Sequence, residues 1–260
     1  MTRYKLLVEY DGHGLVGWQR QANGPSVQEL IEQAAEKFCG NTTACTGAGR
    51  TDAGVHALGQ VAHLDFAMPF SAGTVRDALN AYLRPAKVTV LEAELVSEEF
   101  HSRFSATKRE YLYIIVNRRA PLTLEQGRAW LVPKHLDVKL MRAAGEHLLG
   151  KHDFTSFRAA ECQAKSPVKT MDKIEISRHG ETIQITVEAR SFLHRQVRNI
   201  VGTLMLVGTG KLQSDEVKII LEKKDRTEAG PCAPAEGLYL KAISYKHPAG
   251  KLVTPPPKPT

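Results

Sequence analysis

Both halves of this chain of 260 residues carry the same order of hydrophobic patterns, and that order restricts the folds the chain can adopt. Apolar residues that alternate with polar ones predict strands, and apolar residues at helical spacing predict helices. In the first half the order is β-α-β-β-α-β, expected over residues 4–10, 27–38, 42–46, 60–66, 74–84 and 88–95. In the second half strands are expected over 110–117, 169–177, 182–189 and 238–245, with helices over 137–149, 194–207 and 214–221.

Each half resembles a ferredoxin-like βαββαβ unit. We therefore expect an α+β protein in which two fused ferredoxin-like units form one broad antiparallel sheet with helices on one face. The expected domains are residues 1–105 and 106–246, and a proline-rich tail over 247–260 is expected to be disordered. No repeat of individual residues links the halves, so the expected duplication rests on the order of the elements.

The two helices of the first half have recognisable ends. Ser26 and Glu29 form a capping-box pattern at the start of one helix, and Gly40 suits its end. Thr74 is expected to open the next helix. Pro85 helps to end it because proline lacks a backbone N–H group.

The positive charge is confined to the second half. Residues 1–130 carry 14 basic and 14 acidic side chains, whereas residues 131–260 carry 21 basic and 14 acidic ones, which accounts for the net charge of +7. A one-sided positive charge favours association with a polyanion. The balance of charge alone therefore suggests a nucleic-acid partner and points to the second half.

Several features favour a cytoplasmic protein. No stretch approaches 18 uncharged apolar residues, so no transmembrane helix is expected. Glu9 and Asp11 interrupt the start of the chain before a signal peptide develops. The four cysteines form no CxxC pair and are expected to be reduced thiols.

The sequence contains none of the common motifs that bind cofactors or metals. Gly47 and Gly49 start like a dinucleotide-binding loop, but Asp52 stands where the third glycine is needed. Gly210-Lys211 lacks the earlier glycine of a phosphate-binding loop, and the histidines and cysteines lack metal-ligand spacing. The absence of an HxE motif followed by PCxxC weighs against a zinc-dependent base deaminase. We therefore expect neither a metal nor a cofactor.

Residues 46–57 contain the strongest candidates for catalytic side chains. Glycines on both sides of Asp52 allow a sharp turn or a close approach to a ligand. If the backbone is extended, Arg50 and Asp52 point to the same side, and the guanidinium would keep the carboxylate ionised, as a nucleophile requires. The alternative is an aspartate that bonds its own backbone in a glycine-rich turn, and the residues alone leave both open.

The sequence Gly-Arg-Thr-Asp-Ala-Gly-Val-His-Ala over residues 49–57 resembles the active-site signature of the tRNA pseudouridine synthase A family. One departure from the family is Arg195-Gln196-Val197, where members often carry His-Met-Val. Other stretches that agree, in the family's order, are Tyr10-Asp11-Gly12, Gly17-Trp18-Gln19, Ser26-Val27-Gln28, Phe104-Ser105-Ala106, Lys108-Arg109-Glu110-Tyr111, residues 152–157, Phe192-Leu193-His194, residues 197–202 and residues 233–240.

The resemblance implies an isomerase that converts uridines 38, 39 and 40 of the tRNA anticodon stem-loop to pseudouridine on a flipped-out base. It implies that Asp52 is the nucleophile, that Tyr111 is a catalytic residue that stacks on the uracil, and that Arg198 pairs with the aspartate. Leu238 would pack under the base, and Arg50 would bind a phosphate or fill the space that the flipped nucleotide leaves. It further implies a homodimer.

Each assignment has a simpler alternative. Tyr111 and Tyr113 share one face of a predicted strand, so either is equally well explained as a core aromatic. Arg198 is equally well a solvated helical arginine, and Leu238 an ordinary core residue. The expected RNA-binding cations, each equally compatible with a solvated surface, are Arg103, Lys108, Arg109 and Arg158.

Two other functions remain open from the sequence. Paired ferredoxin-like units also suit a non-catalytic RNA-binding module, but the aromatic signature of such modules is absent. A pseudouridine synthase that acts on another RNA position is the second alternative, because the choice of target depends on the shape of loops.

Overall fold

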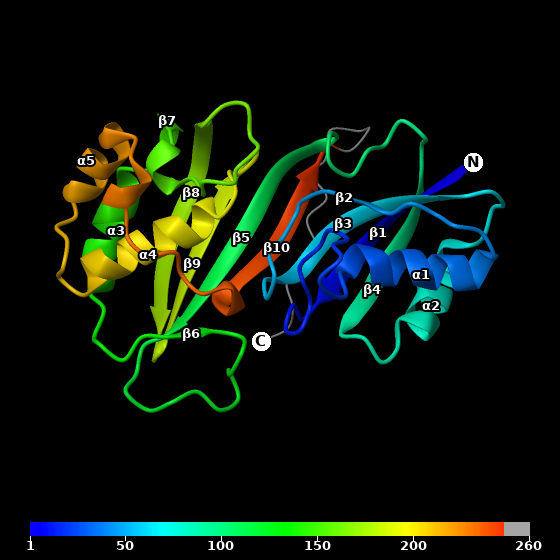
Figure 1. Cartoon of the computed structure of the whole chain (residues 1–260), viewed down its shortest axis with the longest axis horizontal. Helices are drawn as coiled ribbons and strands as arrows, with labels where there is room; N and C mark the ends of the chain where they lie inside the picture. The colour runs from blue at the N-terminus through cyan, green and yellow to red at the C-terminus, as the bar shows by residue number, and fades with distance from the viewer. Residues whose placement is uncertain (247–260) are drawn as a thin grey trace. The chain divides into compact units, whose positions relative to one another are not determined.

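The computed structural model describes residues 1–246, which form two compact units coloured along the chain in Figure 1. Unit 1 contains Met1–Thr107 and the chain from Tyr239 onward, and unit 2 contains Lys108–Leu238. The last strand of the chain therefore returns to unit 1. The tail over 247–260, which is predicted to be disordered, lies outside the described residues.

The strands of unit 1 follow the order β4-β1-β3-β10. Strand β1 pairs antiparallel with both β3 and β4, whereas β10 pairs parallel with β3, and the short β2 pairs antiparallel with β3. Helices α1 and α2 lie together on one side of these strands (Figure 1). The elements of this unit are β1 (Thr2–Tyr10), α1 (Val27–Cys39), β2 (Thr46–Gly47), β3 (His56–Phe66), α2 (Ala72–Leu83), β4 (Val88–Val96) and β10 (Leu238–Tyr245).

The core of unit 1 lies between its strands and helices. Tyr4, Leu6 and Val8 of β1 are fully buried, as their alternation with less buried residues predicts. The ring of Phe38 in α1 lies 5.6 Å from that of Phe66 in β3, which in turn lies 5.6 Å from the ring of Tyr4. The helices thus cover the apolar face of the strands and leave their other face more exposed.

The ends of α1 confirm the sequence prediction, whereas the start of α2 corrects it. Ser26 Oγ accepts from the N–H of Glu29 at 3.3 Å, and Gly40 closes α1 in the left-handed conformation. Helix α2 begins earlier than expected, because Ser71 rather than Thr74 is its cap. Ser71 Oγ accepts from the N–H of Thr74 at 3.0 Å, so that Thr74 lies inside the first turn.

The strands of unit 2 follow the order β5-β9-β8-β7 and pair antiparallel, while β6 pairs parallel with β5. The predicted hairpin between β8 and β9 is confirmed, with Gly180 at a φ of 60° in its turn. Three 3₁₀ turns also occur, η1 (Thr155–Phe157), η2 (Arg226–Glu228) and η3 (Ala235–Gly237). The other elements are β5 (Ala106–Val116), β6 (Trp130–Leu131), α3 (Val138–Glu146), β7 (Gly150–Asp153), β8 (Val168–His179), β9 (Thr182–Ala189), α4 (Gln196–Gly208) and α5 (Glu216–Lys223).

Two helices of unit 2 are shorter than predicted. Helix α3 ends at Glu146, where the N–H groups of Leu148 and Leu149 turn to the carbonyls of Gly145 and Glu146, and Gly150 begins β7 with a φ of 93°. Helix α4 begins at Gln196 rather than His194, because Arg195 takes up a left-handed conformation with a φ of 59°. The residues on the predicted apolar side of α4 are buried, so its role in the core is unchanged; they are Val197, Ile200, Val201 and Leu204.

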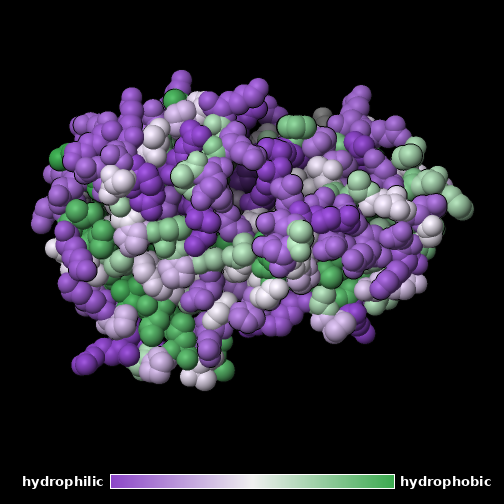
Figure 2. Space-filling view, viewed as in Figure 1, coloured by the Kyte–Doolittle hydropathy of each residue, from purple (hydrophilic) through white to green (hydrophobic). Residues whose placement is uncertain are grey.

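The predicted α+β class is confirmed, with five α-helices and ten mostly antiparallel strands over residues 1–246. Hydrophilic side chains predominate on the face shown in Figure 2, and hydrophobic ones gather over the loop before β6, where Leu124 is 85% exposed. Within the described part of the chain, every helix is too short or too polar to cross a membrane.

Candidate active site

Asp52 lies in the loop that joins β2 to β3 in unit 1. The preceding residue, Thr51, is buried, and its hydroxyl lies 2.8 Å from that of Tyr10. The N–H of Trp18 donates to the carbonyl of Thr51 at 3.1 Å. Burial differs along this stretch, since Thr51 is buried, Arg50 is exposed and Asp52 is half-buried.

The backbone on either side of Asp52 is held by further hydrogen bonds. The fully buried amide of Gln60 accepts from the N–H of Gly49 at 3.3 Å and donates to its carbonyl at 2.8 Å. After the aspartate, the N–H of Val55 donates to the carbonyl of Asp52 at 3.1 Å and closes a turn. The loop is thus fixed at both ends, which presents the carboxylate from a rigid support.

Glycines outside the loop allow its close packing. A Cβ atom on Gly17, which has a φ of 106°, would overlap the carbonyl oxygen of Thr51 and lie 3.0 Å from the carbonyl carbon of Asp52. A Cβ atom on Gly12 would overlap the carbonyl of Val55 in the same way. The motif around Asp52 predicts a role only for the glycines beside it. Gly12 and Gly17 stand in the motifs Tyr10-Asp11-Gly12 and Gly17-Trp18-Gln19, but these motifs do not show which atoms the two glycines contact.

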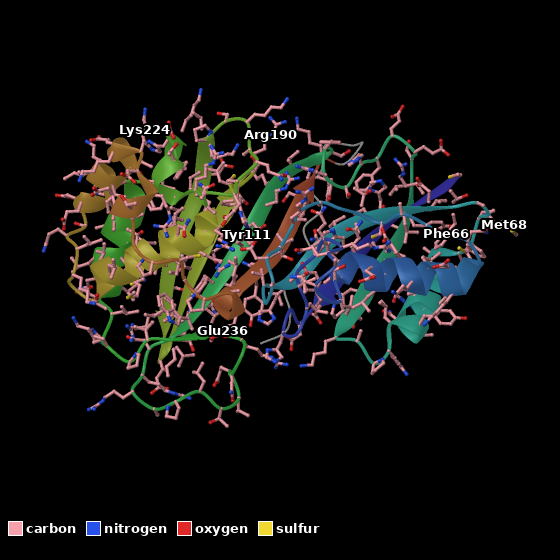
Figure 3. The ribbon with its side chains drawn as sticks, viewed as in Figure 1. Phe66, Met68, Tyr111, Arg190, Lys224 and Glu236 are labelled. Carbon is pink, nitrogen blue, oxygen red and sulfur yellow. The ribbon has the colours of Figure 1, made fainter. Side chains whose placement is uncertain are left out.

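Tyr111 and Tyr113 of β5 differ in their surroundings, although they lie on one face of the strand. Tyr113 is fully buried, and its hydroxyl donates to the carbonyl of Pro234 at 2.8 Å. Burial raises the pKa of Tyr113 above its ordinary value. Tyr111 is 9% exposed, and its ring lies 5.1 Å from that of Phe192 at an angle of 89°. Tyr113 is therefore a core residue, whereas Tyr111, labelled in Figure 3, reaches the edge of the core.

Arg198 of α4 is fixed by the chain that precedes β10. Its Nε–H donates to the carbonyl of Ala233 at 2.7 Å, and the N–H of Ala233 donates to the carbonyl of Arg198 at 3.1 Å. Helix α4 can accept this segment because a Cβ atom on Gly202 would overlap the carbonyl of Pro231. The half-buried arginine is therefore held in one orientation, unlike a solvated helical arginine.

Leu238 follows the same segment and is buried. The glycine before it, Gly237, approaches β5 so closely that a Cβ atom would lie 2.6 Å from Cζ of Tyr113. The segment over 230–238 is thus packed on both α4 and β5 within unit 2.

The four predicted RNA-binding cations have different surroundings. Lys108 donates to Glu188 at 2.5 Å, and this hydrogen bond raises the pKa of Lys108. Arg109 donates to a backbone carbonyl at 2.7 Å, and Arg158 donates to another at 2.6 Å. The exposed Arg103 lies beside the ring of Phe104.

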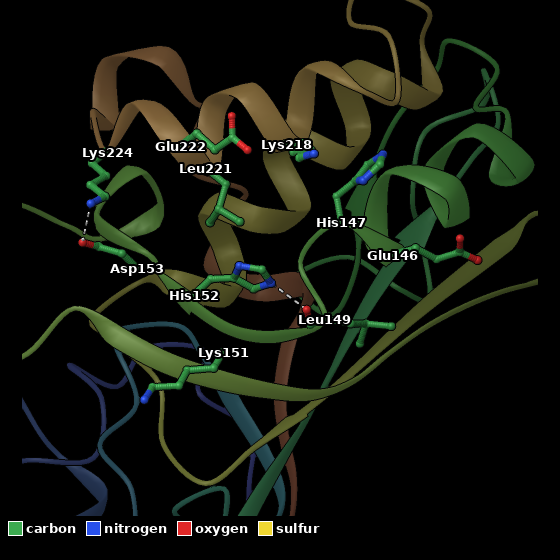
Figure 4. Close-up of a pocket in the computed structure, with 10 residues that line it drawn as sticks. All are labelled: Glu146, His147, Leu149, Lys151, His152, Asp153, Lys218, Leu221, Glu222 and Lys224. Carbon is green, nitrogen blue, oxygen red and sulfur yellow. Dashed lines mark hydrogen bonds and ion pairs between the residues drawn. The ribbon is translucent and has the colours of Figure 1, made fainter.

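A cavity of about 570 Å³ lies in unit 2 among α3, β7 and α5, and is shown in Figure 4. None of its lining residues belongs to the predicted site, and Lys224, which lines it, lies well apart from Tyr111 in Figure 3. Its charges also balance, which gives RNA no net attraction. The charged residues other than histidine are Lys151, Lys218, Lys224, Glu146, Asp153 and Glu222.

The predicted site residues come from both units. Arg50 and Asp52 share one loop of unit 1. Tyr111, Arg198 and Leu238 belong to unit 2, where the segment over 230–238 links their supports.

A family model described as tRNA pseudouridine synthase matches residues 6–105 and 144–246. The tRNA pseudouridine synthase A of Paramagnetospirillum magneticum is 59% identical over 251 residues, which cover 96% of this chain and 98% of that protein. The enzyme of the same name from Maricaulis maris is 56% identical over 96% of this chain and 100% of its own length. A solved structure titled as a Cbf5-Nop10-Gar1 complex matches 78% of this chain and 45% of its own with 12% identity and a TM-score of 0.36, a likeness too weak to bear on the fold.

These matches define the class as an isomerase that modifies tRNA. The chain belongs to the tRNA pseudouridine synthase A family.

Proposed function

We propose that this enzyme converts uridines 38, 39 and 40 of the tRNA anticodon stem-loop to pseudouridine, with Asp52 as the nucleophile. The observation that carries the proposal is the loop around Asp52. Its backbone is fixed by Gln60 and Trp18, and the Asp52 side chain is half-buried next to the buried Thr51. A nucleophilic carboxylate needs such a fixed position, because the reacting atoms must meet at a defined distance.

The reaction rearranges bonds within one nucleotide. The bond between N1 of uracil and C1′ of ribose breaks, the base turns, a bond forms between C5 and C1′, and the proton on C5 leaves for solvent while N1 gains one. Asp52 attacks either C1′ or C6, and leaves again when the new bond has formed. The target base must first leave its stack, which costs about a few kcal/mol.

Tyr111 and Arg198 are the proposed catalytic residues of unit 2. The phenol of Tyr111 stacks on the uracil, and its oxygen accepts the C5 proton. The 9% exposure of Tyr111, against the full burial of Tyr113, supports this choice. Arg198 pairs with the nucleophilic aspartate, and the bond from its Nε–H to the carbonyl of Ala233 supports this role by fixing the guanidinium.

The remaining predicted residues bind the substrate. Leu238 packs under the base, and Arg50 contacts a phosphate or fills the place of the flipped nucleotide. The cations Arg103, Lys108, Arg109 and Arg158 hold the RNA backbone, so binding should weaken as salt rises. We further propose that the enzyme acts as a homodimer in the cytoplasm, where its tRNA substrate is found.

Release of tritium from C5 of labelled uridine in tRNA tests the proposal. We expect release by the wild-type enzyme, none by the Asp52→Ala variant, and similar tRNA binding by both. Asp77→Ala is the matched control, because this exposed carboxylate pairs only with its neighbour Arg76 in the described residues and should leave release unchanged. Full release by Asp52→Ala would refute the assignment of the nucleophile.

A further inference from the structure

Phe104 is an aromatic side chain that unit 1 holds in solvent. Its ring is 74% exposed, in the turn that joins Phe100 to β5. Burying a phenylalanine stabilises a protein by about 1.5–3 kcal/mol, so an exposed ring in a rigid turn calls for a reason. The contacts of the turn show that the chain holds the ring in this position.

The turn is rigid because His101 and Ser105 close it from both sides. The N–H of Ser105 donates to the carbonyl of His101 at 2.9 Å, and Ser105 Oγ accepts from the N–H of His101 at 3.0 Å. Nδ1 of His101 accepts from the N–H groups of Arg103 at 3.2 Å and of Phe104 at 3.4 Å. The imidazole ring lies 4.3 Å from the ring of Phe104, which limits the positions that this ring can take.

Buried hydrogen bonds join the turn to the strand that leads to Asp52. Ser102 is fully buried, and its hydroxyl donates to the carbonyl of Thr46 at 2.7 Å and lies 2.9 Å from Nδ1 of His63. The carbonyl of Ser102 accepts from the hydroxyl of Tyr245 at 2.6 Å. Thr46 begins β2, which runs directly into the Asp52 loop. The turn and the loop therefore share a support within unit 1.

The chemistry of the turn suits an unpaired nucleobase. The guanidinium of Arg103 lies 5.8 Å from the centre of the Phe104 ring, so a cation and an aromatic face stand side by side. This combination binds single-stranded nucleic acid, in which bases stack on aromatic rings and cations contact the phosphates.

We propose that Phe104 is a positioning residue that stacks on an unpaired base of the bound tRNA. The proposal depends on the proposed role of Asp52 in one respect, which is that the RNA binds beside the Asp52 loop of unit 1. Stacking would supply affinity without reading the sequence, because every base has an aromatic face. Phe104 would thus act on the binding of tRNA and leave the chemical step unchanged.

Replacing Phe104 by alanine, leucine and tyrosine tests the proposal. The dissociation constant of each variant is measured with an anticodon stem-loop RNA, and kcat and KM are measured for pseudouridine formation. We expect Phe104→Ala and Phe104→Leu to weaken binding at least about fivefold, and Phe104→Tyr to stay within about twofold of the wild type. We expect KM to rise in the first two variants while kcat stays close to the wild-type value. Melting temperatures should not change, since the ring is already in solvent.

The dependence of binding on salt separates Phe104 from its neighbour. Phe104→Ala should leave the slope of log affinity against log salt unchanged. Arg103→Gln should make this negative slope shallower by about 0.7 to 0.9. Unchanged affinity of Phe104→Ala, or wild-type affinity of Phe104→Leu, would overturn the proposal. So would a change of oligomeric state in Phe104→Ala, because a second copy of the chain would then cover the ring. Pseudouridine formation by the wild type tests the proposed function separately.

Discussion

Gly17→Ala tests whether the segment before α1 holds the Asp52 loop in place. The added Cβ atom would overlap the carbonyl oxygen of Thr51 and come within 3.0 Å of the carbonyl carbon of Asp52. Both contacts are with backbone atoms, so no side chain can turn aside. The loop that carries the proposed nucleophile, or the segment around Gly17, has to move by about 1 Å, which is enough to lower a rate by about 100-fold.

Gly14→Ala is the matched control, because Gly14 lies in the same segment and has a φ of 78°, but a Cβ atom there would meet nothing within 4 Å. Both substitutions place alanine at a positive φ, which costs about 1–2 kcal/mol. Both variants should therefore melt a few degrees below the wild type. Only Gly17→Ala should also lose about 100-fold in kcat/KM for pseudouridine formation, which corresponds to about 2.7 kcal/mol of transition-state stabilisation.

The assay is pseudouridine formation in tRNA at a temperature where circular dichroism shows both variants to be folded. A kcat/KM close to the wild-type value in both Gly17→Ala and Gly14→Ala would refute the reasoning, because it would show that the overlap is relieved without moving the reactive carboxylate. A loss in Gly14→Ala as large as that in Gly17→Ala would do the same, because it would assign the effect to backbone strain.

Three further predictions concern other parts of the two units. Gly202→Ala should displace the carbonyl of Pro231 and with it the support of Arg198, and we expect kcat for pseudouridine formation to fall at least about tenfold. Tyr113→Phe should cost about 1 kcal/mol of stability in urea denaturation, through loss of one hydrogen bond, with little change in kcat. Burial, together with nearby positive charge, lowers the pKa of His63 to about 4. An unfolded histidine binds a proton below about pH 6.5, so the free energy of unfolding should fall as the pH is lowered from about 6.5 to about 4. This fall should be smaller in His63→Gln.

Elements with strong local signals were predictable from the sequence. Helix α1 has both its cap and its terminal glycine in the sequence, and β1 shows unbroken alternation between buried and less buried residues. These signals act within a few residues, so they survive in any tertiary context. The start of α2 was misplaced because Ser71 and Thr74 are both good caps, and only the packing of the helix decides between them.

Features that depend on distant pairing were not predictable. Strands β6 and β7 are two and four residues long, too short for an alternating pattern to appear in the sequence. They are strands because a neighbouring strand pairs with them, and not because of the propensity of their own residues. Strand β10 was predicted, but nothing in its sequence shows that Tyr239 pairs with His56 of β3. In the same way, the motif around Asp52 marks the loop, while the approach of Gly17 to Thr51 joins residues that only the fold brings together.

The most direct test of the central claim is a single-turnover experiment with wild-type enzyme and the Asp52→Asn variant. Asparagine keeps the size of the side chain and removes its charge, and excess enzyme removes any effect of affinity. Pseudouridine is then mapped along the tRNA at single-nucleotide resolution. The account predicts pseudouridine at positions 38, 39 and 40 with the wild type and none with Asp52→Asn. Modification at other positions by the wild type, or at these positions by Asp52→Asn, would contradict it.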